Sequence, residues 1–229
     1  MRRKIVRNLV IASLAVVGVA ILLSRRFEDL FLNVQLTSLK RIWDRDIGEE
    51  QSRRLLDRVR GCYEEIEQRR THFEKGVMRF LRAQTIIGIA IYRALLDEMQ
   101  DRQEAIKETE RLIWEVQLKI LGNIIGFSLG LRKDPFDRFE RVLPYINRYV
   151  FPTPPYERTD VEVAGGVGFD FTKCYTCEFL KDEGVPELTI AFCNQDWRLA
   201  KLYPRQIEYQ RDHCMGEGAE FCDFRYFRR

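Results

Sequence analysis

The residue pattern changes at Phe151-Pro152-Thr153-Pro154-Pro155, and this change constrains the fold more than any other feature of the chain. The prolines make the segment a stiff connector, because proline fixes its own φ and restricts the residue before it. Before the connector, apolar residues recur at helical spacing; after it, apolar and polar residues alternate as in strands. The sequence therefore predicts an α+β protein, with a helical region over residues 27–150 and a small, mainly antiparallel sheet with short helices over residues 151–229.

Helical signals fill the first region. Residues 49–70 carry an apolar stripe on a charged helix. Residues 73–99 contain the stretch IIGIAIY, which is too short and too close to arginines to span a membrane. We therefore expect residues 73–99 to form a buried core helix.

Two further helices begin at capping aspartates, Asp101 and Asp134. We expect the first to run to about Leu121 and to end at Gly122, because glycine commonly follows the last helical residue. Pro144 is expected to bend or stop the second.

Strand patterns appear only after the connector. The alternating segments are VGFDFT, RQIEYQRDH and EFCDFRYF. Two short helices are expected between the first and second strands. One covers residues 173–183 and stops at Gly184, and the other begins at Pro186.

The N-terminus has the pattern of a membrane anchor. Basic residues precede an apolar run over residues 5–23, and a helix of that length rises about 28 Å, close to the hydrocarbon thickness of a bilayer. A cleaved signal peptide would end in small residues, whereas this run ends in LLSRR. We expect residues 1–26 to be a single-pass anchor and residues 27–229 to form one soluble unit. Basic residues on both sides leave its orientation open.

Charge and composition limit the partners. The chain has 38 basic and 35 acidic residues and a net charge of +3, so no field of one sign indicates nucleic acid. A hydrophobic share of 45% with 32% charged residues is ordinary for a packed globular protein. A small-molecule ligand, the membrane and a homo-oligomeric partner remain compatible with the sequence.

The cysteines are the main candidates for chemistry. Cys174 and Cys177 open a helix directly after a strand, where free backbone N–H groups and the helix dipole favour a thiolate. Cys193 lies near the expected end of the next helix, three residues before Asp196. Cys222 lies in the last strand and points away from Asp223, its neighbour.

Other interpretations of the cysteines stay open. A zinc site would need Cys193, His213, Cys214 and Cys222 to complete the CxxC pair from irregular spacing, so we expect no metal cofactor. Cys62 and Cys214 are expected to be core residues, since cysteine is often buried. A disulfide between Cys193 and Cys174 or Cys222 would require an oxidising compartment.

Two basic residues near the last strands are further candidates. Arg211 could bind a carboxylate with both arms, or simply be an exposed strand arginine. His213 lies beside glycines that let a backbone approach a ligand, although a structural histidine is equally expected.

The order of these segments resembles a known family. FDFTKC, EFLKDEGVPEL, FCNQDW and RDHCMGEGAEFCDFRY, with IAIYRALLDEMQDRQEAIKETERLIWE upstream, are similar to the L-2-amino-thiazoline-4-carboxylic acid hydrolase family over about residues 74–226. The resemblance implies hydrolytic opening of a cyclic C–N/C–S bond on the way to cysteine through a carbamoyl-cysteine. The positions that match the family pattern are Cys174, Cys193, Asp196, Arg211, Gly218, Cys222 and Asp223.

This resemblance predicts roles for individual residues. Cys193, Cys174 and Asp196 are the predicted catalytic residues, either by thiolate attack on the ring carbon or by Asp196 activating water. The predicted substrate-binding residues are Arg211, His213, Cys222, Asp223 and Trp197. Two alternatives remain: a membrane-tethered module that binds a small molecule or metal without turnover, and an adaptor that uses the 49–70 helix as a partner-binding face.

Overall fold

The computed structural model describes residues 27–70, 76–130 and 134–229. The predicted anchor, residues 5–23, lies outside these ranges. Within them, no single helix has both the length and the apolar character needed to cross a membrane. One bent pair of segments, Arg102–Leu118 and Gly122–Gly130 with 56° between them, meets that test by length and composition.

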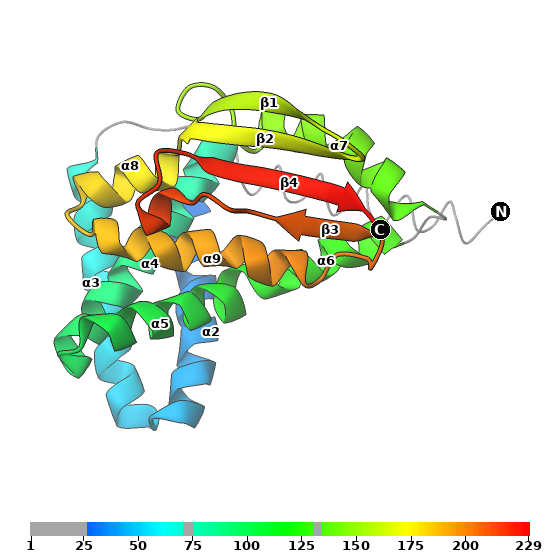
Figure 1. Cartoon of the computed structure of the whole chain (residues 1–229). Helices are drawn as coiled ribbons and strands as arrows, with labels where there is room; N and C mark the ends of the chain where they lie inside the picture. The colour runs from blue at the N-terminus through cyan, green and yellow to red at the C-terminus, as the bar shows by residue number, and fades with distance from the viewer. Residues whose placement is uncertain (1–26, 71–75, 131–133) are drawn as a thin grey trace.

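Helices make up the region before the connector, as predicted. Their bounds are α2 (Phe27–Asp46), α3 (Glu49–Arg69), α4 (Val77–Met99), α5 (Arg102–Ile113), the π-helical turn η1 (Trp114–Leu118), α6 (Lys119–Gly130) and α7 (Pro135–Tyr149). Helices α2, α3 and α4 pack together, and α5 packs on α4 (Figure 1). The stretch IIGIAIY is wholly buried within α4, so the expected core helix is confirmed.

The apolar stripe of α3 is buried inside the chain. Leu55, Val59, Tyr63 and Ile66 are each at most 2% exposed, and α3 packs against α2 and α4. The stripe is therefore part of the core, and it is not available as the partner-binding face that the adaptor interpretation required.

Both predicted aspartate caps are present. The side chain of Asp101 accepts hydrogen bonds from the backbone N–H groups of Gln103 and Glu104, and Asp134 accepts one from Asp137. These bonds satisfy N–H groups that have no partner within the helix.

Pro144 does not stop α7, which continues to Tyr149. The predicted helix end at Gly122 is wrong, because the helical path continues to Gly130. Gly122 serves close packing instead of termination: a Cβ there would lie 2.7 Å from Cδ1 of Leu202. At Gly126 a Cβ would lie 2.3 Å from the carbonyl oxygen of Leu202, so α6 contacts the segment after α9 through its glycines.

The C-terminal region contains a four-stranded antiparallel sheet, which confirms the predicted architecture. The strands are β1 (Glu157–Val163), β2 (Gly166–Lys173), β3 (Ile207–Gln210) and β4 (Cys222–Arg228), in the order β1-β2-β4-β3. Strand β1 was not predicted. Its sequence, ERTDVEV, is mostly charged because it forms an exposed edge, which charged residues protect from pairing with other chains.

Short helices connect the strands. Between β2 and β3 lie α8 (Tyr175–Asp182), the 3₁₀ turn η2 (Pro186–Leu188) and α9 (Thr189–Ala200), and η3 (Met215–Glu217) lies between β3 and β4. The two predicted helices are thus present. Cys193, however, lies in the middle of α9 and not near its end, because the helix continues to Ala200.

One face of the sheet carries an aromatic layer that packs against helices. Phe169 on β2 stacks on Phe224 on β4, with 4.9 Å between ring centroids. Helix α7 contacts this layer through Phe139, whose ring centroid lies 4.5 Å from that of Tyr226. The layer places the start of β4, the end of β2 and the middle of α9 at the same end of the molecule (Figure 1).

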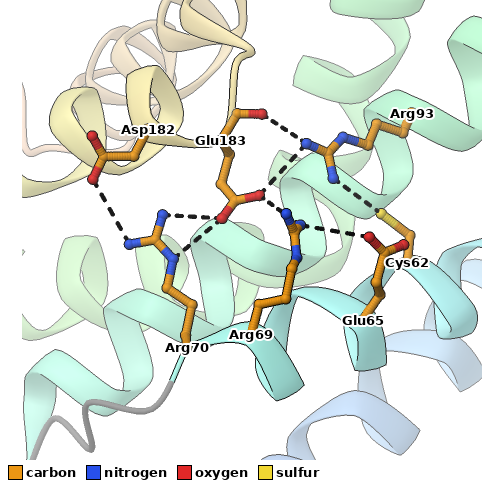
Figure 2. A network of polar contacts seen from close by, with 7 residues as sticks. All are labelled: Cys62, Glu65, Arg69, Arg70, Arg93, Asp182 and Glu183. Carbon is orange, nitrogen blue, oxygen red and sulfur yellow. Dashed lines mark hydrogen bonds and ion pairs between the residues drawn. The ribbon is translucent and has the colours of Figure 1, made fainter.

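A buried carboxylate joins the helical region to this end of the sheet. Glu183, the C-cap of α8, is surrounded by Arg69 and Arg70 at the end of α3 and by Arg93 of α4 (Figure 2). Its Oε atoms lie 3.1 Å from Arg69 Nη2, 3.0 Å from Arg70 Nη2 and 3.5 Å from Arg93 Nη2. Arg93 also donates to the Glu183 carbonyl oxygen at 2.7 Å. The site below is therefore attached to the helices by charge as well as by packing.

Candidate functional site

Three cysteine sulfurs meet at the end of the sheet. Cys193 comes from α9, Cys214 precedes η3, and Cys222 is the first residue of β4. Their Sγ atoms all lie within 4.8 Å of one another. Cys214 and Cys222 are buried, at 2% and 5% exposure, and Cys193 is half-buried. We call these residues the three-thiol cluster.

Backbone contacts hold η3 and the residues on either side of it against this cluster. The N–H of Met215 donates to Cys222 Sγ at 3.2 Å. A Cβ on Gly216 would lie 3.0 Å from the Cα of Ile190 and 3.2 Å from Cys193 Sγ, so a side chain there would press on α9. Gly218 ends η3 with φ +92°, a conformation that favours glycine.

The CxxC pair extends the cluster along α8. Cys174 is the N-cap of α8 and Cys177 lies in its first turn, as predicted. The thiols of Cys174 and Cys177 contact each other, and Cys177 also contacts Cys193. The Cys177 contact lowers the pKa of Cys174, and the reciprocal contact raises that of Cys177. All six cysteines of the chain are free thiols in the structure.

Negative charge within the three-thiol cluster favours Cys214. Contacts with Cys193 and Cys222 and the nearby Arg211 guanidinium hold the pKa of Cys214 far below its ordinary value. The pKa of Cys193 is raised by its contacts with Cys177 and Cys214, and that of Cys222 by its contacts with Cys193 and Cys214. Among the three, these contacts favour negative charge on Cys214 over Cys193 and Cys222.

Asp196 lies beside the cluster on the same helix. It follows Cys193 by three positions, so the two side chains share one face of α9. Arg211 Nη1 donates both to Asp196 Oδ2 and to the carbonyl oxygen of Cys193, each at 2.9 Å. The Arg211 side chain is 2% exposed and that of Asp196 is 37% exposed. The arginine is therefore an interior anchor, and the carboxylate is the group that solvent reaches.

The environment of Asp196 raises its pKa. Burial among neighbouring side chains raises it to about 7, while Arg211 acts in the opposite direction. The negative charge at Cys214 adds to the effect of burial.

Trp197 forms the exposed edge of this site. It is 40% exposed, and its ring packs edge-on against Tyr209 with 4.9 Å between centroids. The Arg211 guanidinium lies 5.9 Å from the Trp197 ring centroid. An apolar surface therefore lies next to the Asp196 carboxylate.

Two predicted binding residues lie apart from the thiols. Asp223 points to the opposite face of β4 from Cys222, as expected, and accepts the backbone N–H groups of Asp212 and His213. The His213 ring stacks on Phe221 at 4.7 Å, and its side chain is 54% exposed. Asp223 thus shapes the loop that carries Arg211 and Cys214, and His213 is outside the three-thiol cluster.

Cys214 was expected to be a core residue more than a metal ligand. It is buried, as expected, but its sulfur also completes the cluster with Cys193 and Cys222. The available signal was the position of Cys214 at a strand end, opposite the start of another strand that also carries a cysteine. Spacing along the chain does not show this proximity, because the three cysteines come from different elements.

The fold and the site define a thiol-rich α+β protein with a carboxylate at its candidate site. A family model described as L-2-amino-thiazoline-4-carboxylic acid hydrolase matches residues 78–226, well over half of the chain. The chain belongs to this family, which confirms the predicted resemblance. Family membership implies a hydrolase that acts on a carbon–nitrogen bond of a cyclic substrate. The whole cluster, Asp196 and Arg211 lie within the matched residues.

Other comparisons add little. Among curated proteins, none matches this sequence. Two crystal structures of an H-NOX protein from S. oneidensis, one in the Fe(II) state and one in the Fe(II)NO state, align over 86% of this chain and over 95% and 98% of theirs. Their sequence identities are 10% and 13% and their TM-scores 0.38 and 0.35, and likenesses at this level carry no argument.

Proposed function

We propose that this protein hydrolyses L-2-amino-thiazoline-4-carboxylic acid or a close cyclic relative, with water as the nucleophile and Asp196 as the general base. Water adds to the ring carbon between nitrogen and sulfur, and one water proton passes through Asp196 to the ring nitrogen, which leaves a hydroxyl group on that carbon. The hydroxyl group becomes the carbonyl as the bond from this carbon to one ring heteroatom breaks and the hydroxyl proton passes through Asp196 to that leaving atom, so the product is a carbamoyl-cysteine that contains the atoms of one water molecule.

The carrying observation is the position of the Asp196 carboxylate. It is partly exposed and fixed by the interior Arg211, and it lies beside the three-thiol cluster within the family's matched region. A carboxyl group whose pKa lies near neutrality exists in both protonation states at physiological pH, as a proton shuttle requires. The exposed Trp197 offers a surface for the apolar part of the ring.

Burial and protonation favour water over a thiolate as the nucleophile. The neighbours of Cys193 raise the pKa of its thiol, and Cys214, where the contacts favour negative charge, is only 2% exposed. Cys174 is half-buried, and its thiol contacts Cys177. We therefore assign the nucleophilic role to water.

The geometry also suggests roles for the predicted binding residues. Arg211 is a positioning residue in this proposal, because its Nη1 already holds Asp196 and the Cys193 carbonyl. Trp197 is the substrate contact. The loop before β4 carries the far side of the site. Three predicted binding residues position this loop: Cys222, Asp223 and His213.

The test uses the full chain in detergent under reducing conditions. It is incubated with L-2-amino-thiazoline-4-carboxylic acid, and mass spectrometry follows a product heavier by one water. Asp196→Asn is expected to reduce turnover by at least about 100-fold. Asp212→Asn, which changes an exposed aspartate on the neighbouring loop, is the matched control and is expected to change turnover less than about twofold.

The two alternative results have distinct meanings. Full turnover in Asp196→Asn would reject Asp196 as the base while keeping the hydrolase. No turnover from folded wild-type protein would reject this substrate and favour a binding module.

A membrane anchor is part of the same proposal. It rests on the apolar run over residues 5–23 and the basic residues around it. The full chain is expected in the membrane fraction after alkaline carbonate washing, and a chain that begins at residue 27 is expected in the supernatant. Release of the full chain by the wash would reject the anchor.

A further inference from the structure

The three-thiol cluster has the composition of a metal site, which goes beyond the role that the proposed function gives it. Cysteine sulfurs commonly pack singly among apolar side chains as small hydrophobic groups. Here three sulfurs from separate elements, α9, the segment before η3 and β4, lie mutually within 4.8 Å. None of these three cysteines forms a disulfide bond.

The spacing of these sulfurs suits one ion. Zinc binds thiolate sulfur at about 2.3 Å, which separates two ligands of a tetrahedral site by about 3.8 Å. Sulfurs that lie within 4.8 Å of one another reach that separation by small side-chain shifts. The turn η3 already packs against α9 at Gly216, next to Cys193 Sγ.

The surroundings favour bound thiolates. The Met215 N–H donates to Cys222 Sγ at 3.2 Å, the kind of contact that stabilises a metal-bound sulfur. The interior guanidinium of Arg211 is bonded to the Cys193 carbonyl and supplies positive charge beside the cluster. Three thiolates around a divalent ion carry a net charge of −1, which this cation offsets.

Ligand type and number narrow the choice of metal. Thiolate ligands select zinc, copper(I) or iron–sulfur clusters over magnesium, calcium or manganese. Three protein ligands leave a fourth position open, which is the arrangement of catalytic zinc sites. Zinc is also the ion that lowers the pKa of a bound water without redox chemistry.

We infer that Cys193, Cys214 and Cys222 bind one zinc ion through their three thiolates and leave the fourth position to water. The catalytic consequence rests on the proposed function: the bound water is the nucleophile, and Asp196, one turn along α9 from Cys193, accepts its proton. Binding releases the thiol protons to solvent. The sequence predicted no metal cofactor, because the spacing of the cysteines along the chain does not reveal the cluster.

The first test measures metal on the reduced full chain in detergent. After treatment with a chelator, the protein is titrated with zinc(II), and bound metal is measured by mass spectrometry. One zinc per chain is expected. Cobalt(II), used as a spectroscopic probe, is expected to give thiolate-to-metal charge-transfer absorption that zinc abolishes. Absence of stoichiometric zinc or of this absorption would overturn the inference.

Matched cysteine variants locate the site. Cys214→Ser is expected to weaken zinc binding by more than about 100-fold, since it removes a ligand. Cys62→Ser, which changes a cysteine on α3 whose sulfur contacts Arg93 at 3.8 Å, is expected to keep full binding. Cys177→Ser is also expected to keep it; loss of zinc there would mean four thiolate ligands and would refute the open position.

A measurement on the wild-type chain covers the case in which Cys214→Ser does not fold. Alkylation followed by peptide mass spectrometry is expected to show that zinc protects Cys193, the half-buried member of the cluster, and that chelation restores its labelling, with Cys62 unchanged. Labelling of Cys193 that does not respond to zinc would contradict the site.

Turnover on the same samples separates the two proposals. Zinc binding without turnover would keep the metal site and reject the hydrolase, whereas turnover that survives complete removal of metal would do the reverse.

Discussion

At the scale of single residues, the protonation of Asp196 decides when the proposed site is active. The charged groups that shift the pKa of Asp196 are Arg211, which directly follows β3, and Cys214. Asp196 in turn acts on the pKa values of three nearby tyrosines, Tyr203, Tyr209 and Tyr226. Burial exceeds the effect of Arg211 and raises the pKa of Asp196 to about 7. A general base must be deprotonated, so kcat/KM is expected to rise with pH through about 7 and then level off.

The same pKa has a consequence for stability with the opposite trend. The folded-state pKa of Asp196 lies above the value of an unfolded aspartate, 3.8. The folded protein therefore binds this proton more tightly, and the contribution of Asp196 to stability is greatest below pH 4 and declines as pH rises through about 7.

The assignment of Asp196 as the general base is tested by the pH dependence of turnover. A pH–rate profile that is flat between about pH 5.5 and 8, or one that Asp196→Asn leaves unchanged in shape, would contradict this assignment.

Individual residues also show what the sequence could and could not predict. Cys193 and Cys222 were selected from the pattern and the family resemblance, and they lie together in the structure. Arg211 was expected to meet a substrate or solvent, but its side chain is buried and bonded within the protein. Cys214 was expected to be a core residue more than a ligand, but its sulfur lies with those of Cys193 and Cys222. Such outcomes depend on which elements meet in space, and local spacing carries no information about that.

At the scale of elements, the glycines of α6 test whether close packing explains the missed helix end. A Cβ on Gly126 would lie 2.3 Å from the Leu202 carbonyl oxygen, which is backbone and cannot rotate away. Gly126→Ala is therefore expected to lower the free energy of unfolding by about 1–3 kcal/mol. Chemical denaturation followed by circular dichroism measures this change.

The matched control for this substitution lies on the same helix. Gly130 has no atom within 4 Å of an added Cβ, so Gly130→Ala is expected to change stability by less than about 1 kcal/mol. Equal effects of the two substitutions would show that helix propensity, and not contact with Leu202, explains both. The helix signals at Asp101 and Asp134 were predictable because capping is local, whereas the meaning of Gly122 and Gly126 depends on a segment far along the chain.

At the scale of the whole molecule, a buried core connects the helices to the sheet, and a charged network joins α3 and α4 to α8. The core extends from Phe31 on α2 to Tyr226 on β4. The network gathers three arginines around Glu183, whose side chain is 5% exposed (Figure 2). The Arg70 guanidinium also lies 4.0 Å from the Phe179 ring centroid, which holds it against α8. Glu183 thereby fixes the end of α8, and α8 carries Cys177 beside the three-thiol cluster.

Glu183→Gln tests this connection. Removal of the negative charge leaves Arg69, Arg70 and Arg93 close together without their shared partner, so the free energy of unfolding is expected to fall by about 2 kcal/mol. The value is below that of a fully buried pair, because the arginine side chains keep between 29% and 53% of their surface in solvent. Asp182→Asn is the control: this neighbouring carboxylate is 66% exposed and lies 3.8 Å from Arg70, so a change within about 0.5 kcal/mol is expected. Denaturation of both variants measures the difference, and equal stabilities would mean that the charge of Glu183 does not help to join α8 to α3 and α4.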